Sequence, residues 1–171
     1  MPPTGVGPKA GLGIIVSLCF PSDFRWVRRT IHQTTEALAN AGLGAEAIGS
    51  VEIVLAEALN NIVEHAYDEA NPGDINLVIK QRRASLLFEI SDKGNPMPNG
   101  RAPLGNHPMS EFNNDPMPEG GYGWFLIREL VRDLIYDRRD AQNFLIFRMA
   151  IEKTPNENSE LTTDANGAKS D

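Results

Sequence analysis

Apolar residues recur with a helical period in two stretches of the first half of the chain. Over Phe24–Ala41 they fall near i, i+4 and i+7, Ser22 or Asp23 can cap the N-terminus, and Gly42 is a suitable end. A second helix is predicted over residues 46–70, closed by the turn NPGD at 71–74. The sequence therefore predicts two consecutive helices near the N-terminus.

The remaining periodic segments are mostly short and apolar, as in strands. Gly13–Phe20 predicts a first strand, and INLVIKQ (75–81) with SLLFEIS (85–91) predicts a hairpin closed by the turn RRA. YGWFLIRELVRD predicts a third helix, and LIYDRR and NFLIFRMAIEK predict two last strands. The fold class is therefore α+β: a two-layer sandwich, with helices packed on one face of a mostly antiparallel sheet.

The chain ends differ in composition from the periodic region between them. Residues 1–11 are rich in Pro and Gly and residues 153–171 are polar, so both segments are expected to be disordered. Residues 12–152 are expected to form one domain. A hydrophobic fraction of 41% and a charged fraction of 23% are typical of globular proteins.

Charge and cysteine content exclude several classes of function. A net charge of −7 argues against nucleic acid or an anionic membrane as a direct partner. Cys19 is the single cysteine, which excludes an internal disulfide and a thiolate metal cluster. The apolar run from Leu12 to Phe20 is too short to span a bilayer, and no cleavage site follows it. A cytoplasmic protein is the expectation.

The stretch between the predicted hairpin and the third helix has no periodicity. Residues 92–121 are loaded with Pro, Gly and Asn. A loop of this length inside a compact domain is either a functional lid or a disordered insertion.

The second predicted helix carries a narrow polar stripe at the border of its apolar face. At 100° per residue, Glu57, Asn61 and His65 stand at i, i+4 and i+8 along this border, whereas Asn60 and Glu64 point toward solvent. Asn is a poor choice inside a helix, because its side chain competes for backbone hydrogen bonds. The stripe indicates either a site or the ordinary polar edge of an amphipathic helix.

Two further segments carry candidate ligand-binding residues. Asp92 directly follows a predicted strand, where its carboxylate can accept from an exocyclic amine, and Gly94 would let the backbone approach a flat ring; an ordinary turn is the alternative. Gly121 and Gly123 precede the third helix, whose N-terminus can bind a phosphate; a hinge and cap is the alternative. The sequence contains no P-loop, and its histidines lack the spacing of a zinc site.

Taken together, these segments resemble a known set of motifs. Glu57-x-x-x-Asn61-x-x-x-His65, then Asp92-x-Gly94-x-Pro96, then Gly121-x-Gly123-x-x-Leu126-Ile127 are similar in kind and order to the N, G1 and G2 boxes of the Bergerat-fold ATP-binding superfamily of gyrases, heat-shock chaperones, histidine kinases and mismatch-repair proteins. GGYGWFLI more narrowly resembles the bacterial anti-sigma factor serine/threonine kinases. The resemblance spans residues 12–152.

The resemblance implies a role for each of these residues. Asn61 would ligate Mg²⁺, and Glu57 would act as the catalytic base toward a substrate hydroxyl. Asp92 would bind the adenine amino group of ATP, and Gly94 would give the base access. Gly121 and Gly123 would offer backbone N–H groups to the phosphates, and His65 would lie near the phosphates or the lid. The loop Met97–Gly120 would be a long ATP lid.

The implied function is that of an ATP-dependent serine/threonine protein kinase and anti-sigma factor. It would phosphorylate an anti-sigma factor antagonist of the STAS type and would bind and sequester a sigma factor; the resemblance also suggests a homodimer. The helix 24–41, with Arg25, Arg28 and Arg29, is the hypothesis for the partner surface. The alternative is a non-catalytic partner-switch protein that binds ATP as a structural ligand. Arg101 and His107 are the lid's only basic candidates for contact with the γ-phosphate.

Overall fold

The computed structural model describes residues 13–68, 70–82, 84–105 and 122–151. Along the chain it contains β1 (Gly13–Pro21), α1 (Phe24–Asn40), α2 (Ala45–His65), β2 (Asp74–Arg82), β3 (Ser85–Asp92), the short 3-10 turn η1 (Pro98–Gly100), α3 (Tyr122–Leu130), β4 (Arg132–Arg139) and β5 (Gln142–Ala150). The helices and strands follow the order that the sequence predicts. Both predicted terminal segments and most of the predicted lid lie outside the described residues.

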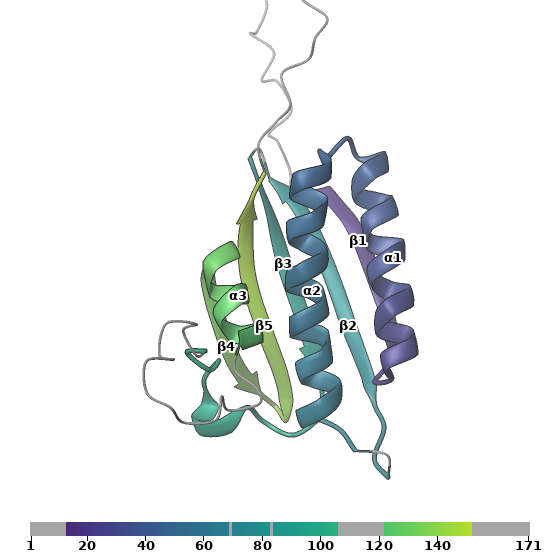
Figure 1. Ribbon diagram of the computed structural model, residues 1–171. Helices are drawn as coiled ribbons and strands as arrows, with labels where there is room; N and C mark the ends of the chain where they lie inside the picture. The colour runs from purple at the N-terminus through teal and green to yellow at the C-terminus, as the bar shows by residue number, and fades with distance from the viewer. Residues whose placement is uncertain (1–12, 69, 83, 106–121, 152–171) are drawn as a thin grey trace, which may run out of the picture.

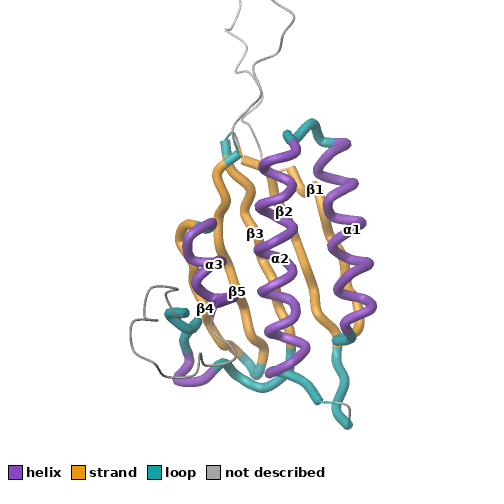
Figure 2. The backbone as a smooth tube through the Cα atoms, in the orientation of Figure 1, coloured by secondary structure: helices purple, strands orange, loops and turns teal. Residues whose placement is uncertain are grey.

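The strands form one antiparallel sheet with the order β1-β2-β3-β5-β4. Figure 1 shows α1, α2 and α3 side by side on one face of this sheet, with α2 in the middle. In Figure 2 the strands run behind the helices as a single twisted layer. The predicted α+β sandwich with helices on one face is confirmed.

The core lies between the helices and the sheet. Strands β2, β3 and β5 alternate buried and half-buried positions, as expected for a sheet with one covered face. Phe88 on β3 and Phe147 on β5 stack there, with their ring centroids 4.8 Å apart. Helix α2 buries one apolar face in this core, and Ala66, directly after the helix, is buried as well; the buried helix residues are Val51, Val54, Leu55, Ala58, Leu59 and Ile62.

Helix α2 ends earlier than the sequence predicts, at His65 instead of residue 70. Two hydrogen-bond arrangements compete with a further turn. The carbonyl of Ala66 accepts from the backbone N–H of Asn95 at 2.7 Å, and Oδ1 of Asp68 accepts from the backbone N–H groups of Ala70 and Asn71. The early end brings the last turn of α2 against the loop that follows β3.

Helix α3 is likewise shorter than predicted. It ends at Leu130, and β4 already begins at Arg132, so the last residues of the predicted helix are strand. The first turn of α1 is capped as predicted, because the Asp23 carboxylate accepts from the backbone N–H of Arg25 at 2.7 Å. Among the described helices, none combines the length and apolar character that crossing a membrane requires.

Candidate functional site

A cavity of about 690 Å³ lies at the C-terminal end of α2, between this helix, the end of β3 and the beginning of α3. Its size is within the range of small-molecule sites, about 300–1,000 Å³. The cavity brings together residues that are far apart in the sequence and that belong to the three predicted motifs. Those that line it are Glu57, Asn61, His65, Asp92 and Gly123.

The polar stripe of α2 forms one wall of this cavity. Asn61 donates from Nδ2 to the backbone carbonyl of Glu57, one turn earlier, at 2.6 Å. This bond ties the amide nitrogen to the helix, and no described residue donates to the amide oxygen, Oδ1. The arrangement answers why an asparagine is tolerated inside a helix: its amide nitrogen back-bonds to the helix, and its oxygen stays available at the cavity wall.

His65 is the last residue of α2 and stands at the open edge of the cavity. Its side chain is 70% exposed, with Nε2 3.9 Å from the carboxylate of Glu64. Glu64 also borders the cavity, although its side chain is largely exposed, as the sequence predicts. The histidine therefore lines the cavity at a place where its side chain is open to solvent.

Glu57 faces the beginning of α3. A Cβ built on Gly123 would overlap Oε2 of the Glu57 carboxylate, so only glycine fits this position without a shift of the glutamate. Gly123 stands in the first turn of α3, at the positive end of the helix dipole. The carboxylate of Glu57 and the N-terminal turn of α3 thus meet at one point.

Asp92 is the last residue of β3 and is only 4% exposed. Its Oδ1 accepts two hydrogen bonds, from the backbone N–H of Gly94 and from Nδ2 of Asn143, each at 2.8 Å. No described residue donates to its Oδ2. One oxygen is therefore fixed by the protein, and the other is left to accept from a ligand in the cavity.

Burial is the main influence on the ionisation of Asp92. Desolvation raises the pKa of this carboxyl above its ordinary value of 3.8, against the lowering effect of the Asn143 and Gly94 hydrogen bonds and the charge of Arg138. Nearby, burial raises the pKa of Tyr67, whose hydroxyl accepts from the backbone N–H of Lys93 at 2.9 Å. Tyr67 thus holds the turn that follows Asp92.

Gly94 does not line the cavity. A Cβ at this position would overlap the backbone carbonyl of Ala66, because the turn after β3 passes directly against the end of α2. This close approach accounts for the glycine physically, and the predicted contact of Gly94 with a base stays a prediction. Gly121, the other predicted phosphate-binding glycine, lies outside the described residues.

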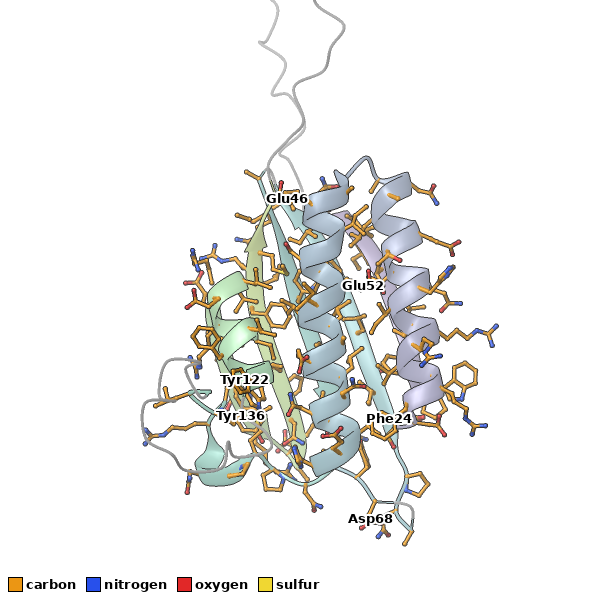
Figure 3. The ribbon with its side chains drawn as sticks, in the orientation of Figure 1. Phe24, Glu46, Glu52, Asp68, Tyr122 and Tyr136 are labelled. Carbon is orange, nitrogen blue, oxygen red and sulfur yellow. The ribbon has the colours of Figure 1, made fainter. Side chains whose placement is uncertain are left out.

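The polar cavity residues outside the predicted motifs include Asn143 on β5 and Tyr136 on β4. Asn143 has a signal that could have found it, because it occupies an inward position of a strand whose other inward residues are apolar. Tyr136 has no such signal, since an aromatic residue in a half-buried strand is ordinary. In the view of Figure 3 the label of Tyr136 stands below that of Tyr122, near the lower end of α3.

Comparison with known proteins gives a family match over most of the chain. The sequence profile of the histidine kinase-like ATPase domain matches residues 20–149. The serine-protein kinase RsbW of Staphylococcus aureus is 33% identical over 122 residues, which are 70% of this chain and 76% of that protein. The serine/threonine-protein kinase BtrW of Bordetella bronchiseptica is 37% identical over 89 residues, 52% of this chain. That alignment spans 61% of BtrW, less than two thirds of its length.

A solved structure shares the fold. The crystal structure of the RsbU and RsbW domains of Rv1364c from Mycobacterium tuberculosis superposes with a TM-score of 0.51 at 14% identity, over 80% of this chain and 32% of that one. At this identity the likeness concerns the fold alone. The sequence relatives and the fold agree with the motifs that converge on the cavity.

Proposed function

This chain belongs to the histidine kinase-like ATPase domain family, and from this premise we propose that it is an ATP-dependent serine/threonine protein kinase that acts as an anti-sigma factor. Family membership implies ATP binding, and the proposal goes further to the reaction and the partners. The observation that carries it is the position of Glu57 in the cavity, one helical turn from Asn61 and against the first turn of α3.

Glu57 is the proposed catalytic base. Hydrogen bonds and ion pairs among the described residues leave its carboxylate without a partner, so it is free to accept a proton. The oxygen of a substrate serine would form the new bond to the γ-phosphorus while the bond to the departing ADP breaks, and the serine proton would pass to Glu57. A protein that used ATP only as a structural ligand would have no need of this carboxylate.

Asn61 is the proposed protein ligand of Mg²⁺. Its Oδ1 is a neutral oxygen held at the cavity wall by the bond from Nδ2 to the helix, which suits a hard cation. The described residues contain no cluster of His, Cys, Asp or Glu side chains able to hold a metal by themselves. Proteins usually bind Mg²⁺ through one or two carboxylates together with substrate phosphates, and here a neutral amide oxygen would take the place of the carboxylate. When bound, the ion would neutralise charge on the phosphate oxygens.

The two ends of the nucleotide would be held by different elements. The first turn of α3 at Gly123 would receive the phosphates through backbone N–H groups, as would Gly121 just before it. Oδ2 of Asp92 would accept from the adenine amino group. His65, at the entrance, would approach the phosphates from solvent.

The proposed partners are a STAS-type antagonist, as substrate, and a sigma factor. The surface of α1 supports this part of the proposal, because Phe24 and Trp26 are 51% and 40% exposed and lie among Arg25, Arg28 and Arg29. The Arg29 guanidinium stacks over the Trp26 ring, 5.3 Å from its centroid. Exposed Trp and Arg side chains are common binding hot spots, and the arginines suit an acidic partner.

A non-catalytic partner switch is the second candidate. It is favoured by the composition of residues 97–105, the described part of the predicted lid, in which Arg101 is the one cation. In a kinase, a basic residue beside the transferred phosphate speeds the reaction because it neutralises charge in the transition state. The two candidates differ in a single measurable property, the transfer of phosphate to the antagonist.

The deciding experiment follows the γ-phosphate of radiolabelled ATP to a candidate antagonist from the same genome. Wild type should label it, whereas Glu57→Gln should transfer about 10²–10⁴-fold more slowly while still binding ATP. Asn61→Ala should lose Mg²⁺-dependent affinity. Glu52→Gln is the matched control, because Glu52 lies exposed on the same helix, away from the cavity (Figure 3), and should behave as wild type.

Each possible failure of this experiment has its own meaning. Transfer by Glu57→Gln at the wild-type rate would refute the base assignment. ATP binding by wild type without labelling of any antagonist would favour the partner switch. Absence of ATP binding would contradict both candidates.

A further inference from the structure

The side chain of Asn143 is the centre of a buried hydrogen-bond network next to the cavity. It is 4% exposed, and both the nitrogen and the oxygen of its amide group form hydrogen bonds. Nδ2 donates to Oδ1 of Asp92 at 2.8 Å and to the carbonyl of Asn95 at 3.0 Å. Oδ1 accepts from the hydroxyl of Tyr136 at 2.7 Å and from the guanidinium of Arg138. A buried polar group with this many partners has one permitted orientation.

That orientation follows from the chemistry of the neighbours. Reversing the amide would place its oxygen against the Asp92 carboxylate and a backbone carbonyl, which only accept, and its NH₂ against Arg138, which only donates. Tyr136 is fixed in the same manner. Its oxygen accepts from the backbone N–H of Met97 at 3.0 Å, so its own proton is free to point to Asn143.

The result is a hydrogen-bond chain with a single direction. It runs from the Met97 N–H to the Tyr136 oxygen, from the Tyr136 hydroxyl to Oδ1 of Asn143, and from Nδ2 of Asn143 to Oδ1 of Asp92. We name this chain of groups the Tyr136–Asn143 relay. Hydrogen bonds in such a chain polarise one another, so each link strengthens the next.

We propose that the Tyr136–Asn143 relay is a specificity device that holds the Asp92 carboxylate ready for the amino group of a 6-aminopurine and couples this recognition to the backbone at Met97. Tyr136 and Asn143 are positioning residues in this proposal, since they act through Asp92. The inference rests on the proposed binding of ATP in this cavity.

The physical argument concerns the two oxygens of Asp92. The relay and the Gly94 N–H occupy Oδ1, so the carboxylate cannot rotate without breaking two hydrogen bonds. Oδ2, to which no described residue donates, is then the acceptor that Asp92 can offer to a ligand in the cavity that it lines. Adenine presents an amine donor at position 6 and guanine presents a carbonyl acceptor, so a fixed acceptor selects adenine. A rotatable carboxylate would select less strongly.

Through Met97 the relay also links Asp92 to the segment of residues 97–105. Residues 97–105 begin there, at the cavity wall, and the backbone N–H of Met97 is the first link of the chain. A ligand amine that donates a hydrogen bond to Oδ2 of Asp92 therefore polarises the same hydrogen-bond chain that holds the backbone of Met97. Selection of the base and placement of this segment are linked through Tyr136.

The test compares two nucleotides that differ only in the amine. ATP and purine riboside triphosphate, which has hydrogen in place of the 6-amino group, are titrated calorimetrically into wild type, Tyr136→Phe and Asn143→Leu. Tyr136→Phe should lower the affinity for ATP about 5-fold, because it removes a neutral hydrogen bond. Asn143→Leu should lower it about 10–100-fold, because it removes a hydrogen bond to a charged group. Affinity for purine riboside triphosphate should stay within about twofold of wild type.

Gln142→Leu is the matched control. Gln142 is the neighbour of Asn143 on β5, and its amide also bonds across to β3, donating to Ser91 Oγ at 3.1 Å, but it does not border the cavity. It should bind both nucleotides as wild type does. Should Asn143→Leu fail to fold, Tyr136→Phe carries the test alone, because it removes only a hydroxyl.

A double-mutant cycle separates a positioning role from direct contact with the ligand. In an Asp92→Asn background, Tyr136→Phe should no longer change ATP affinity. The inference is overturned if Tyr136→Phe weakens both nucleotides equally, if it weakens neither, or if its effect persists in the Asp92→Asn background. If wild type itself does not distinguish the two nucleotides, the proposed role of Asp92 in ATP binding fails, and the relay fails with it.

Discussion

The carboxylate of Glu57 on α2 lies directly against the Cα of Gly123 at the first turn of α3. A Cβ at position 123 would overlap Oε2 and come within 3.1 Å of the carboxyl carbon. The absence of a side chain at this one position therefore allows the proposed base and the proposed phosphate-binding helix end to meet. The sequence motif explains Gly123 by its N–H group, and the structure adds a steric reason.

Gly123→Ala should consequently impair catalysis more than binding. The added methyl would displace the Glu57 carboxylate, and a misplacement of about 1 Å at a catalytic group can cost on the order of 10²-fold in rate. We expect phosphate transfer to fall by about this factor, while ATP affinity changes by only a few-fold. Steady-state transfer rates and calorimetric ATP titrations measure the two effects.

Gly49→Ala is the control for this substitution. Gly49 lies in α2, and a Cβ there would meet no atom within 4 Å, so the change should stabilise the helix by about 0.5–1 kcal/mol and leave transfer untouched. Transfer by Gly123→Ala at the wild-type rate would show that the contact with Glu57 has no catalytic importance.

Asp92→Asn should make the folded chain more stable at neutral pH, and this gain in stability should depend on pH. Burial raises the pKa of Asp92 in the folded chain, so this group contributes stability that is fully present below the unfolded pKa, 3.8, and is lost as the pH rises through the folded pKa. An asparagine is neutral at every pH and avoids this loss. The variant should melt at a higher temperature than wild type at neutral pH, and the difference should shrink as the pH falls through the raised pKa.

The same variant should lose its preference for ATP over GTP, because the Gly94 N–H and Asn143 Nδ2 would hold the amide oxygen in the place of Oδ1, and the NH₂, a donor, would replace the acceptor Oδ2. Asp74→Asn, at an exposed position on β2, is the comparison and should alter neither property. A wild type and an Asp92→Asn variant with parallel stability curves across pH would contradict the burial argument.

The fold and most of the site follow from local patterns in the sequence. The stripe of Glu57, Asn61 and His65 is predictable because a helix places residues four apart on one face, and the structure puts all three at the cavity. The order of the strands and helices is predictable for the same reason. These features depend only on a period and on a few turn residues.

The remaining features depend on contacts between distant segments. Helix α2 ends at His65 because Ala66 bonds to Asn95, and Gly94 is required because the same carbonyl approaches it. The partners of Asn143 come from two other strands and the loop after β3. Such pairings join segments that are distant in the sequence, so no local sequence pattern predicts them.

Arg128→Lys should loosen residues 97–105. The Arg128 guanidinium, on α3, donates to the carbonyl oxygens of Pro103 and Ala102 at 2.8 and 2.9 Å. A lysine has no rigid fork and cannot reproduce both bonds in this geometry. We expect faster amide hydrogen exchange in this segment and ATP affinity lower by about 2–10-fold, for the loss of one hydrogen bond.

Arg139→Lys is the control, because Arg139 pairs with Asp137 on the exposed surface of β4, where an ion pair contributes about 0–1 kcal/mol. It should leave both exchange and affinity unchanged. Equal exchange rates in Arg128→Lys and wild type would show that the two carbonyl contacts do not restrain the segment.

Trp26→Ala should weaken the binding of protein partners without affecting ATP. Trp26 projects from α1 with the Arg29 guanidinium over its ring, and Phe24 stands exposed at the beginning of the same helix (Figure 3). Truncating an aromatic hot spot typically costs 2 kcal/mol or more, about 30-fold in affinity. Arg29→Gln should weaken binding less, and its effect should diminish as salt is raised, because salt screens exposed charges.

Ile53→Ala removes a similarly exposed apolar side chain from α2 and serves as the control. Surface plasmon resonance against the antagonist and the sigma factor of the same genome measures these affinities; equal losses for Trp26→Ala and Ile53→Ala would rule out α1 as the specific partner surface.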